Sequence, residues 1–104
     1  MENIIIKNVE VQDLNNNDIS GVQVAVEVEI LGDSFSLLYQ VTERDYGVIN
    51  RDLDLDFACD ENDRFYNFCD ARGVEYSAAN EYIMEKSQAQ RLWDEYIEKT
   101  YPED

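Results

Sequence analysis

The sequence predicts an α+β fold: an antiparallel sheet of three to four strands, begun by an N-terminal hairpin or meander, with two to three C-terminal helices packed on one face. Three observations predict it. Apolar and polar residues alternate through the first half of the chain, as in strands with one wet face. Helical spacing replaces that alternation near residue 60. The order of strands first and helices second favours two segregated layers.

The length of 104 residues indicates a single domain, spanning residues 1–104. Apolar residues make up 44% of the chain, which is enough to bury a modest core. Residues 3–12 are predicted as the first strand, because the alternation that Ile4 and Ile6 begin is continued by Val9 and Val11. The phase slips between Ile6 and Val9, which indicates a bulge or a bend.

Residues 21–31 carry the clearest strand pattern. Glu27 and Glu29 alternate with branched apolar residues, so one face is predicted to be buried and the other wet. Gln23 falls on the predicted wet face as well. The residues of the buried face are Val22, Val24, Val26, Val28 and Ile30.

A tight hairpin turn is predicted directly after this strand, with Gly32 and Asp33 as its two loop residues. That loop places Ile30 opposite Phe35 and pairs apolar residues with apolar residues along both strands. A further strand is predicted over residues 48–56.

Helical character begins near Asp60, a candidate N-cap, and Gly73 is placed to end that helix. Ser77 is predicted to cap a last helical region that runs to about residue 100. Within it, Ser87 and Gln90 match a capping box, which favours two helices with a joint over one straight rod.

The charge is the outlying property of the chain. The chain has 24 Asp and Glu residues, 8 Lys and Arg residues and no His, which gives a net charge of −16. Nucleic acids and anionic membranes are polyanions, so direct binding to either is not expected. A basic protein is the complementary partner, above all an enzyme or effector that binds nucleic acid. The plainer alternative is a surface that only keeps the fold in solution.

No catalytic residue, no cofactor and no enzyme activity are predicted. The chain lacks a His to act as a base and has no Gly-x-Ser-x-Gly motif. Cys59 and Cys69 have acidic neighbours, which suppress the thiolate, and Cys69 lies at helical spacing from Phe65 as a core thiol. The start of the chain shows neither a basic leader nor a long apolar run, so a cytoplasmic location is expected.

A metal site is not predicted either. Asp52 to Asp63 place acids at alternate positions and then at the ninth and twelfth positions of a calcium loop. Phe57 stands where that loop needs Gly for its sharp turn, and Asp63 stands where it needs a bidentate Glu. With two Cys and no His, the chain offers too few ligands for zinc.

The acid run from Asp52 to Asp63 is the candidate functional feature, with six acids and no base. In an extended segment Asp52, Asp54 and Asp56 share a face at intervals of about 6.6 Å, while the intervening leucines face the core. Such a row imitates the regular negative charge of a nucleic-acid duplex. Partner-binding residues are therefore predicted at Glu27, Glu29, Asp52, Asp54, Asp56, Asp60, Glu61 and Asp63.

In size and acidity the chain resembles the DNA-mimicking inhibitors of phages and mobile elements, including anti-CRISPR and antirestriction proteins. The resemblance implies a non-enzymatic inhibitor that binds a basic nucleic-acid-handling protein. Two alternatives stay open. One is an immunity protein against a basic nuclease toxin. The other is an accessory or structural protein that assembles through aromatic side chains and a sheet edge, since the chain has seven Tyr and one Trp, Trp93.

Overall fold

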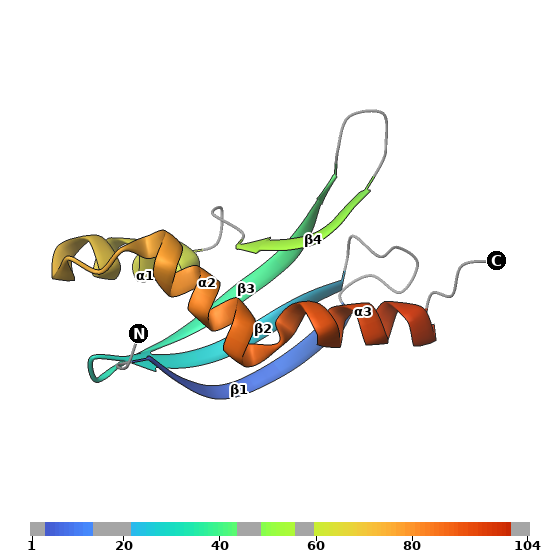
Figure 1. Cartoon of the computed structure of the whole chain (residues 1–104), viewed down its shortest axis with the longest axis horizontal. Helices are drawn as coiled ribbons and strands as arrows, with labels where there is room; N and C mark the ends of the chain where they lie inside the picture. The colour runs from blue at the N-terminus through green and yellow to red at the C-terminus, as the bar shows by residue number, and fades with distance from the viewer. Residues whose placement is uncertain (1–3, 14–21, 44–48, 56–59, 101–104) are drawn as a thin grey trace.

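The computed structural model describes residues 4–13, 22–43, 49–55 and 60–100, with side chains described in 4–13, 22–40 and 60–100. These described residues form four strands followed by three helices (Figure 1). The elements are β1 (Ile4–Asp13), β2 (Val22–Ile30), β3 (Asp33–Glu43), β4 (Ile49–Leu55), α1 (Asp60–Arg72), α2 (Tyr76–Ser87) and α3 (Ala89–Thr100).

The strands form one antiparallel sheet in the order β1-β2-β3-β4, which is a meander. The helices pack against the apolar face of this sheet, with α1 on β3, α2 on β1, and α3 across β1 and β2. Figure 1 shows α1 and α2 together at one end of the sheet and α3 extending toward the other. The predicted α+β class is confirmed, as is the further strand predicted over 48–56.

The hairpin between β2 and β3 forms, but the predicted register was wrong by two residues. Val28, not Ile30, lies opposite Phe35. The loop residues are Leu31 and Gly32, with φ angles of 50° and 88°. A two-residue hairpin turn with both central residues at positive φ matches the strand twist, and here Gly32 takes its second position. Because side chains alternate with a period of two, the shift leaves the core residues of both strands on the buried face.

The predicted irregularity in the first strand is confirmed as a register shift between Ile6 and Asn8. Lys7 is the residue without a cross-strand partner at this point. An extra residue in one strand bends it and increases its twist. The shift is what keeps both Ile6 and Val9 against the core although three positions separate them.

The core lies between the buried face of β2 and β3 and the three helices. Trp93 is completely buried, and its indole N–H donates a hydrogen bond of 3.2 Å to the Val22 carbonyl. The Tyr39 hydroxyl donates to Asn80 Oδ1 at 2.8 Å, so this buried phenol is also satisfied. Cys69 is buried, and burial raises the pKa of its thiol, which confirms it as a core thiol.

The helix ends follow the sequence signals only in part. Helix α1 begins at Asp60, so Asp60 is its first helical residue and not the predicted N-cap, and Asp60, Glu61 and Asp63 lie in the first turn. Gly73 ends α1 at φ 69°, and the Val74 N–H donates to the Cys69 carbonyl at 2.9 Å in a Schellman arrangement.

The joint between α2 and α3 is confirmed. Gln88 takes a left-handed conformation, and Ser87 Oγ accepts a hydrogen bond from the Ala89 N–H at 3.2 Å. Ser77, in contrast, is not the cap of α2, because the helix already begins at Tyr76 and the N-cap position belongs to Glu75. Glu75 makes no side-chain capping hydrogen bond, and Tyr76, the first helical residue, packs against the core.

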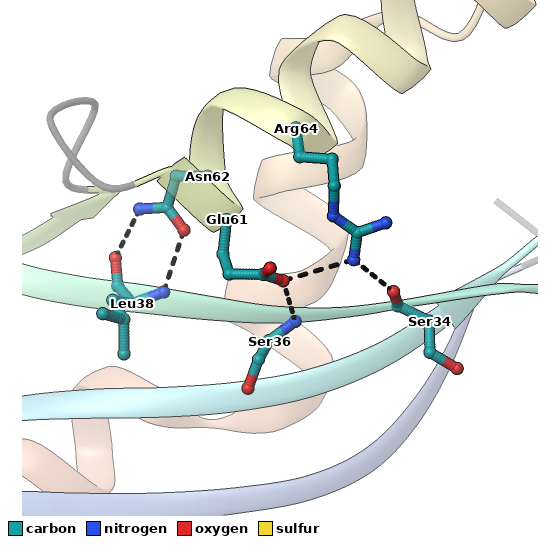
Figure 2. A network of polar contacts seen from close by, with 6 residues as sticks. All are labelled: Ser34, Ser36, Leu38, Glu61, Asn62 and Arg64. Atoms are coloured by element: carbon teal, nitrogen blue, oxygen red, sulfur yellow. Dashed lines mark hydrogen bonds and ion pairs between the residues drawn. The ribbon is translucent and has the colours of Figure 1, made fainter.

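Side chains of α1 complete the edge of β3. β4 pairs with β3 only from Tyr39 to Glu43, so the preceding part of that edge has no strand beside it among the described residues. Asn62 fills the gap at Leu38, accepting from its N–H at 3.0 Å and donating to its carbonyl at 2.9 Å (Figure 2). Its amide therefore makes the same pair of bonds that a neighbouring peptide group would make.

Two more α1 side chains continue this contact along β3 toward the hairpin, as Figure 2 shows. Glu61 Oε2 accepts a hydrogen bond from the Ser36 N–H at 3.5 Å. Arg64 Nη2 donates to the Ser34 carbonyl at 2.8 Å and also pairs with Glu61 at 3.2 Å. We call Glu61, Asn62 and Arg64 the edge clamp. It explains how a strand edge that carries backbone donors and acceptors is covered without a further strand.

We expect Asn62→Ala to lower the free energy of unfolding by about 2–4 kcal/mol, because it leaves two peptide groups of Leu38 without partners in a partly buried place. Urea denaturation measures this change. Asn67→Ala is the matched control, since Asn67 is exposed on the same helix. Equal stability of the two variants would show that the amide of Asn62 contributes nothing at the β3 edge.

A second prediction concerns alkaline pH. Burial raises the pKa of Tyr76 from 10.0 to about 12, with the nearby Cys69, Tyr66 and Asp63 as secondary causes. The folded state therefore holds a proton that the unfolded state releases above its own pKa of about 10. The contribution of Tyr76 is fully present below pH 10 and is lost as the pH rises toward 12. Calorimetry should show a smaller fall in Tm over this range for Tyr76→Phe than for the natural chain. Parallel falls would contradict the assignment.

Candidate functional site

The structure brings together predicted partner-binding residues from β2 and α1. Glu27 lies on the face of β2 that points away from the core, and its register partner on β3 is Ser36. The backbone N–H of Ser36 is the group that Glu61 of α1 accepts from. Adjacent strands are about 4.8 Å apart, so the acids of β2 and Glu61 flank the same short stretch of β3. Glu27 and Glu61 lie 34 positions apart in the sequence, and the sheet register places them on the two sides of Ser36.

Glu29 and Glu61 are partly neutralised by cations of the same chain. The Glu29 carboxylate lies 3.8 Å from Lys7 Nζ, across the strand pair from β1. The carboxylate of Glu61 pairs with Arg64 at 3.2 Å and belongs to the edge clamp. Glu29 and Glu61 therefore take part in contacts within the protein. Among the predicted partner-binding acids whose side chains are described, these two are the least available to a partner.

Glu27, Asp60 and Asp63 differ from these two. All three are exposed, and among the described side chains none of them forms an ion pair or a hydrogen bond. They offer their full charge to an approaching surface. Asp60 and Asp63 lie in the first turn of α1, where carboxylates also suit the positive end of the helix dipole.

The remaining three predicted residues belong to the segment before α1. Asp52 and Asp54 lie within β4, and Asp54 stands opposite Gln40 in the register. The register shifts between Val41 and Thr42, so the regular pairing is interrupted on the Asp52 side of Leu53. The side chains of Asp52 and Asp54, and the whole of Asp56, lie outside the described residues, so the shared face of these three remains a prediction.

The charge imbalance extends over the strands and helices. The described side chains include fifteen carboxylates and six cations. Three ion pairs occur among them: Lys7–Glu29, Arg64–Glu61 and Arg91–Glu95. Each is a surface pair, which contributes little to stability. The surface therefore keeps a large excess of negative charge after its own cations are counted.

The outer face of the sheet holds a feature that sequence reasoning missed. Gln12, Gln23 and Gln40 stand side by side on β1, β2 and β3. Gln40 donates to Gln23 at 2.8 Å, and Gln23 donates to Gln12 at 2.7 Å, so the three amides form a ladder. Gln23 is 5% exposed, which corrects its assignment to a wet face. Each Gln alone has no signal in the sequence, because the ladder depends on the register of three strands.

Among the described residues there is no group of three or more side chains that could hold a metal ion. The calcium-loop spacing from Asp52 to Asp63 crosses residues 56–59, which lie outside the described part of the chain, as does Cys59. No helix in the described ranges is both long and apolar enough to cross a membrane.

Comparison with known proteins finds no matching family model, no matching curated protein and no matching solved structure.

Acids with and without a partner inside the protein should respond differently to substitution. Glu27→Lys should change the free energy of unfolding by no more than about 0.5 kcal/mol, because its carboxylate has no partner within the described residues. Glu61→Lys should lower it by about 1 kcal/mol, since the change removes the acceptor of the Ser36 N–H and places a second cation beside Arg64. Urea denaturation separates the two, and equal losses would show that Glu61 has no structural role.

Proposed function

We propose that the protein is a non-enzymatic acidic inhibitor that binds a basic nucleic-acid-handling protein by imitating the charge of a nucleic acid. The observation that supports this is the placement of exposed carboxylates, without an ion pair among the described side chains, on two elements that both contact β3. Glu27 on β2 and Asp60 and Asp63 on α1 are exposed, and no described cation pairs with them. A net charge of −16 on 104 residues gives the whole surface the sign of a polyanion.

A nucleic-acid mimic would differ from a surface that is merely soluble because its carboxylates are held in a fixed geometry. The edge clamp ties α1 to β3, and β3 is paired with β2, so the acids of the two elements cannot move independently. Carboxylates held at constant separations can match the cations of a groove that normally binds phosphates. Their field would also speed the encounter with a basic partner.

The alternative of an assembly protein is less well supported. Trp93 has no exposed surface, and Tyr39 is buried as well, so neither contributes to an interface. What favours this alternative is Ile5, which is 51% exposed on β1, a strand with no neighbour on its outer side among the described residues. The shift at Lys7 interrupts that edge after three residues, which disfavours pairing with another strand.

The alternative of an immunity protein shares the electrostatic argument and differs in its target, a basic nuclease toxin. Both readings require a basic protein as partner and neither requires a catalytic residue, a cofactor or a direct contact with nucleic acid. The identity of a captured partner decides between them.

Capture from a host lysate on the immobilised chain tests the proposal. A partner held by charge should be released as the salt concentration rises, because screening weakens exposed charge pairs, and it should also be released by added duplex DNA. The double change Glu27→Lys with Asp60→Lys, two exposed acids without an ion pair among the described side chains, should reduce capture at least tenfold. Glu81→Lys with Glu85→Lys is the matched control, since it alters the net charge equally on α2. Capture that resists both salt and DNA would contradict the proposal.

A further inference from the structure

Helix α1 uses its two flanks differently. Arg64 and Arg72 lie on one flank, and each guanidinium is placed over an aromatic ring of the same protein. Arg64 lies 4.3 Å from the ring centre of Phe35, and Arg72 lies 5.0 Å from that of Phe68. A cation over an aromatic face is attracted by the negative charge of that face. On this flank the chain therefore supplies its own cations to its own rings.

The opposite flank has a ring without a cation. Tyr66 is 46% exposed, and it is one of the few large apolar or aromatic side chains that the described residues expose. Asp63 and Asp70, three positions before it and four after it, are exposed neighbours on the same flank. No described cation lies over the Tyr66 ring. We call Asp63, Tyr66 and Asp70 the Tyr66 face.

A chain of ring contacts connects Tyr66 with the core. Its ring meets that of Tyr76 edge-on, with centroids 5.0 Å apart. Tyr76 contacts Phe65 at 6.1 Å, and Phe65 contacts the buried Phe35 at 5.3 Å. Ring pairs at these separations are favourable in edge-on and tilted arrangements. The outermost ring is thus held in position before any partner arrives, which lowers the entropic cost of binding to it.

We propose that the Tyr66 face is the anchor point for an arginine of the basic partner. The guanidinium would lie against the Tyr66 ring, as Arg64 and Arg72 do on their own rings, and its N–H groups would donate to Asp63 and Asp70. This inference rests on the proposed function and adds to it a place and a chemistry of contact. It also involves Asp63, which the acid run singled out, and Tyr66, which it did not.

The charge of the Tyr66 face indicates which kind of molecule could bind to it. A second copy of the chain would bring another −16 charge toward two carboxylates, and an anionic membrane would do the same. A basic protein surface brings the opposite sign. Arginine fits better than lysine, since its planar guanidinium stacks on a ring and donates to carboxylates in a fork geometry.

An octa-arginine peptide titrated into the full-length, ¹⁵N-labelled chain tests the proposal. Amide shifts should concentrate on residues 60–72, and an octa-lysine peptide should bind more weakly. Tyr66→Ala should weaken octa-arginine binding about three- to fivefold, the range expected for one exposed cation–π contact. Tyr66→Phe keeps the ring and should stay within twofold. Since the ring is half exposed, both variants should remain folded, which a melting curve verifies.

The carboxylates have a matched control of equal charge. Asp63→Asn with Asp70→Asn should weaken binding at least threefold more than Glu81→Gln with Glu85→Gln on α2. Equal effects of the two pairs, or equal binding by Tyr66→Ala and the natural chain, would overturn the Tyr66 face while leaving the proposed inhibitor function intact. Shifts on residues 60–72 without any DNA-sensitive partner in the lysate would instead support the face and remove the inhibitor function.

Discussion

The hydrogen bonds between the Asn62 amide and the Leu38 peptide are the contact on which the rest of the arrangement depends. They fasten the first turn of α1 to the part of β3 that β4 does not pair with. A strand edge without partners would carry backbone groups that cost free energy when buried and that invite pairing with another chain. By filling this edge with side chains, the protein covers the unpaired part of β3 and holds α1 against the sheet.

The contact between Asn62 and Leu38 also determines which acids of α1 keep their negative charge exposed. Glu61 and Arg64 flank Asn62 in the edge clamp and neutralise one another, so they contribute little net field. Asp60 and Asp63 point elsewhere on the same turn and keep their charge. One turn of helix thus combines a structural contact with an exposed acidic surface. The repulsion among the many carboxylates opposes folding, and the wholly buried Trp93, Phe65 and β2 valines are the apolar groups that offset it.

Aromatic residues link the core with the surface on both flanks of α1. On one flank the rings of Phe35 and Phe68 bind arginines of the chain itself. On the other flank the exposed ring of Tyr66 lies between two aspartates on the helix surface, and no described cation lies over it. This asymmetry connects the proposed function with the fold, because a basic partner would complete on the second flank an interaction that the protein already makes on the first.

The sequence alone determined the layers, since the period of the apolar residues changes from two to helical spacing near residue 60 and each period buries one face. It also predicted the irregularity near Lys7, the Gly73 helix end and the joint at Ser87, because each has a signal in residues close together in the sequence. The hairpin register, the glutamine ladder and the edge clamp were decided by tertiary structure. A register shift of two residues leaves the apolar alternation unchanged, so the sequence pattern does not distinguish the two registers. Contacts such as that of Asn62 with Leu38 join residues 24 positions apart. Of the predicted site, acidity was evident from composition, whereas which acids are free and which are paired depends on those long-range contacts.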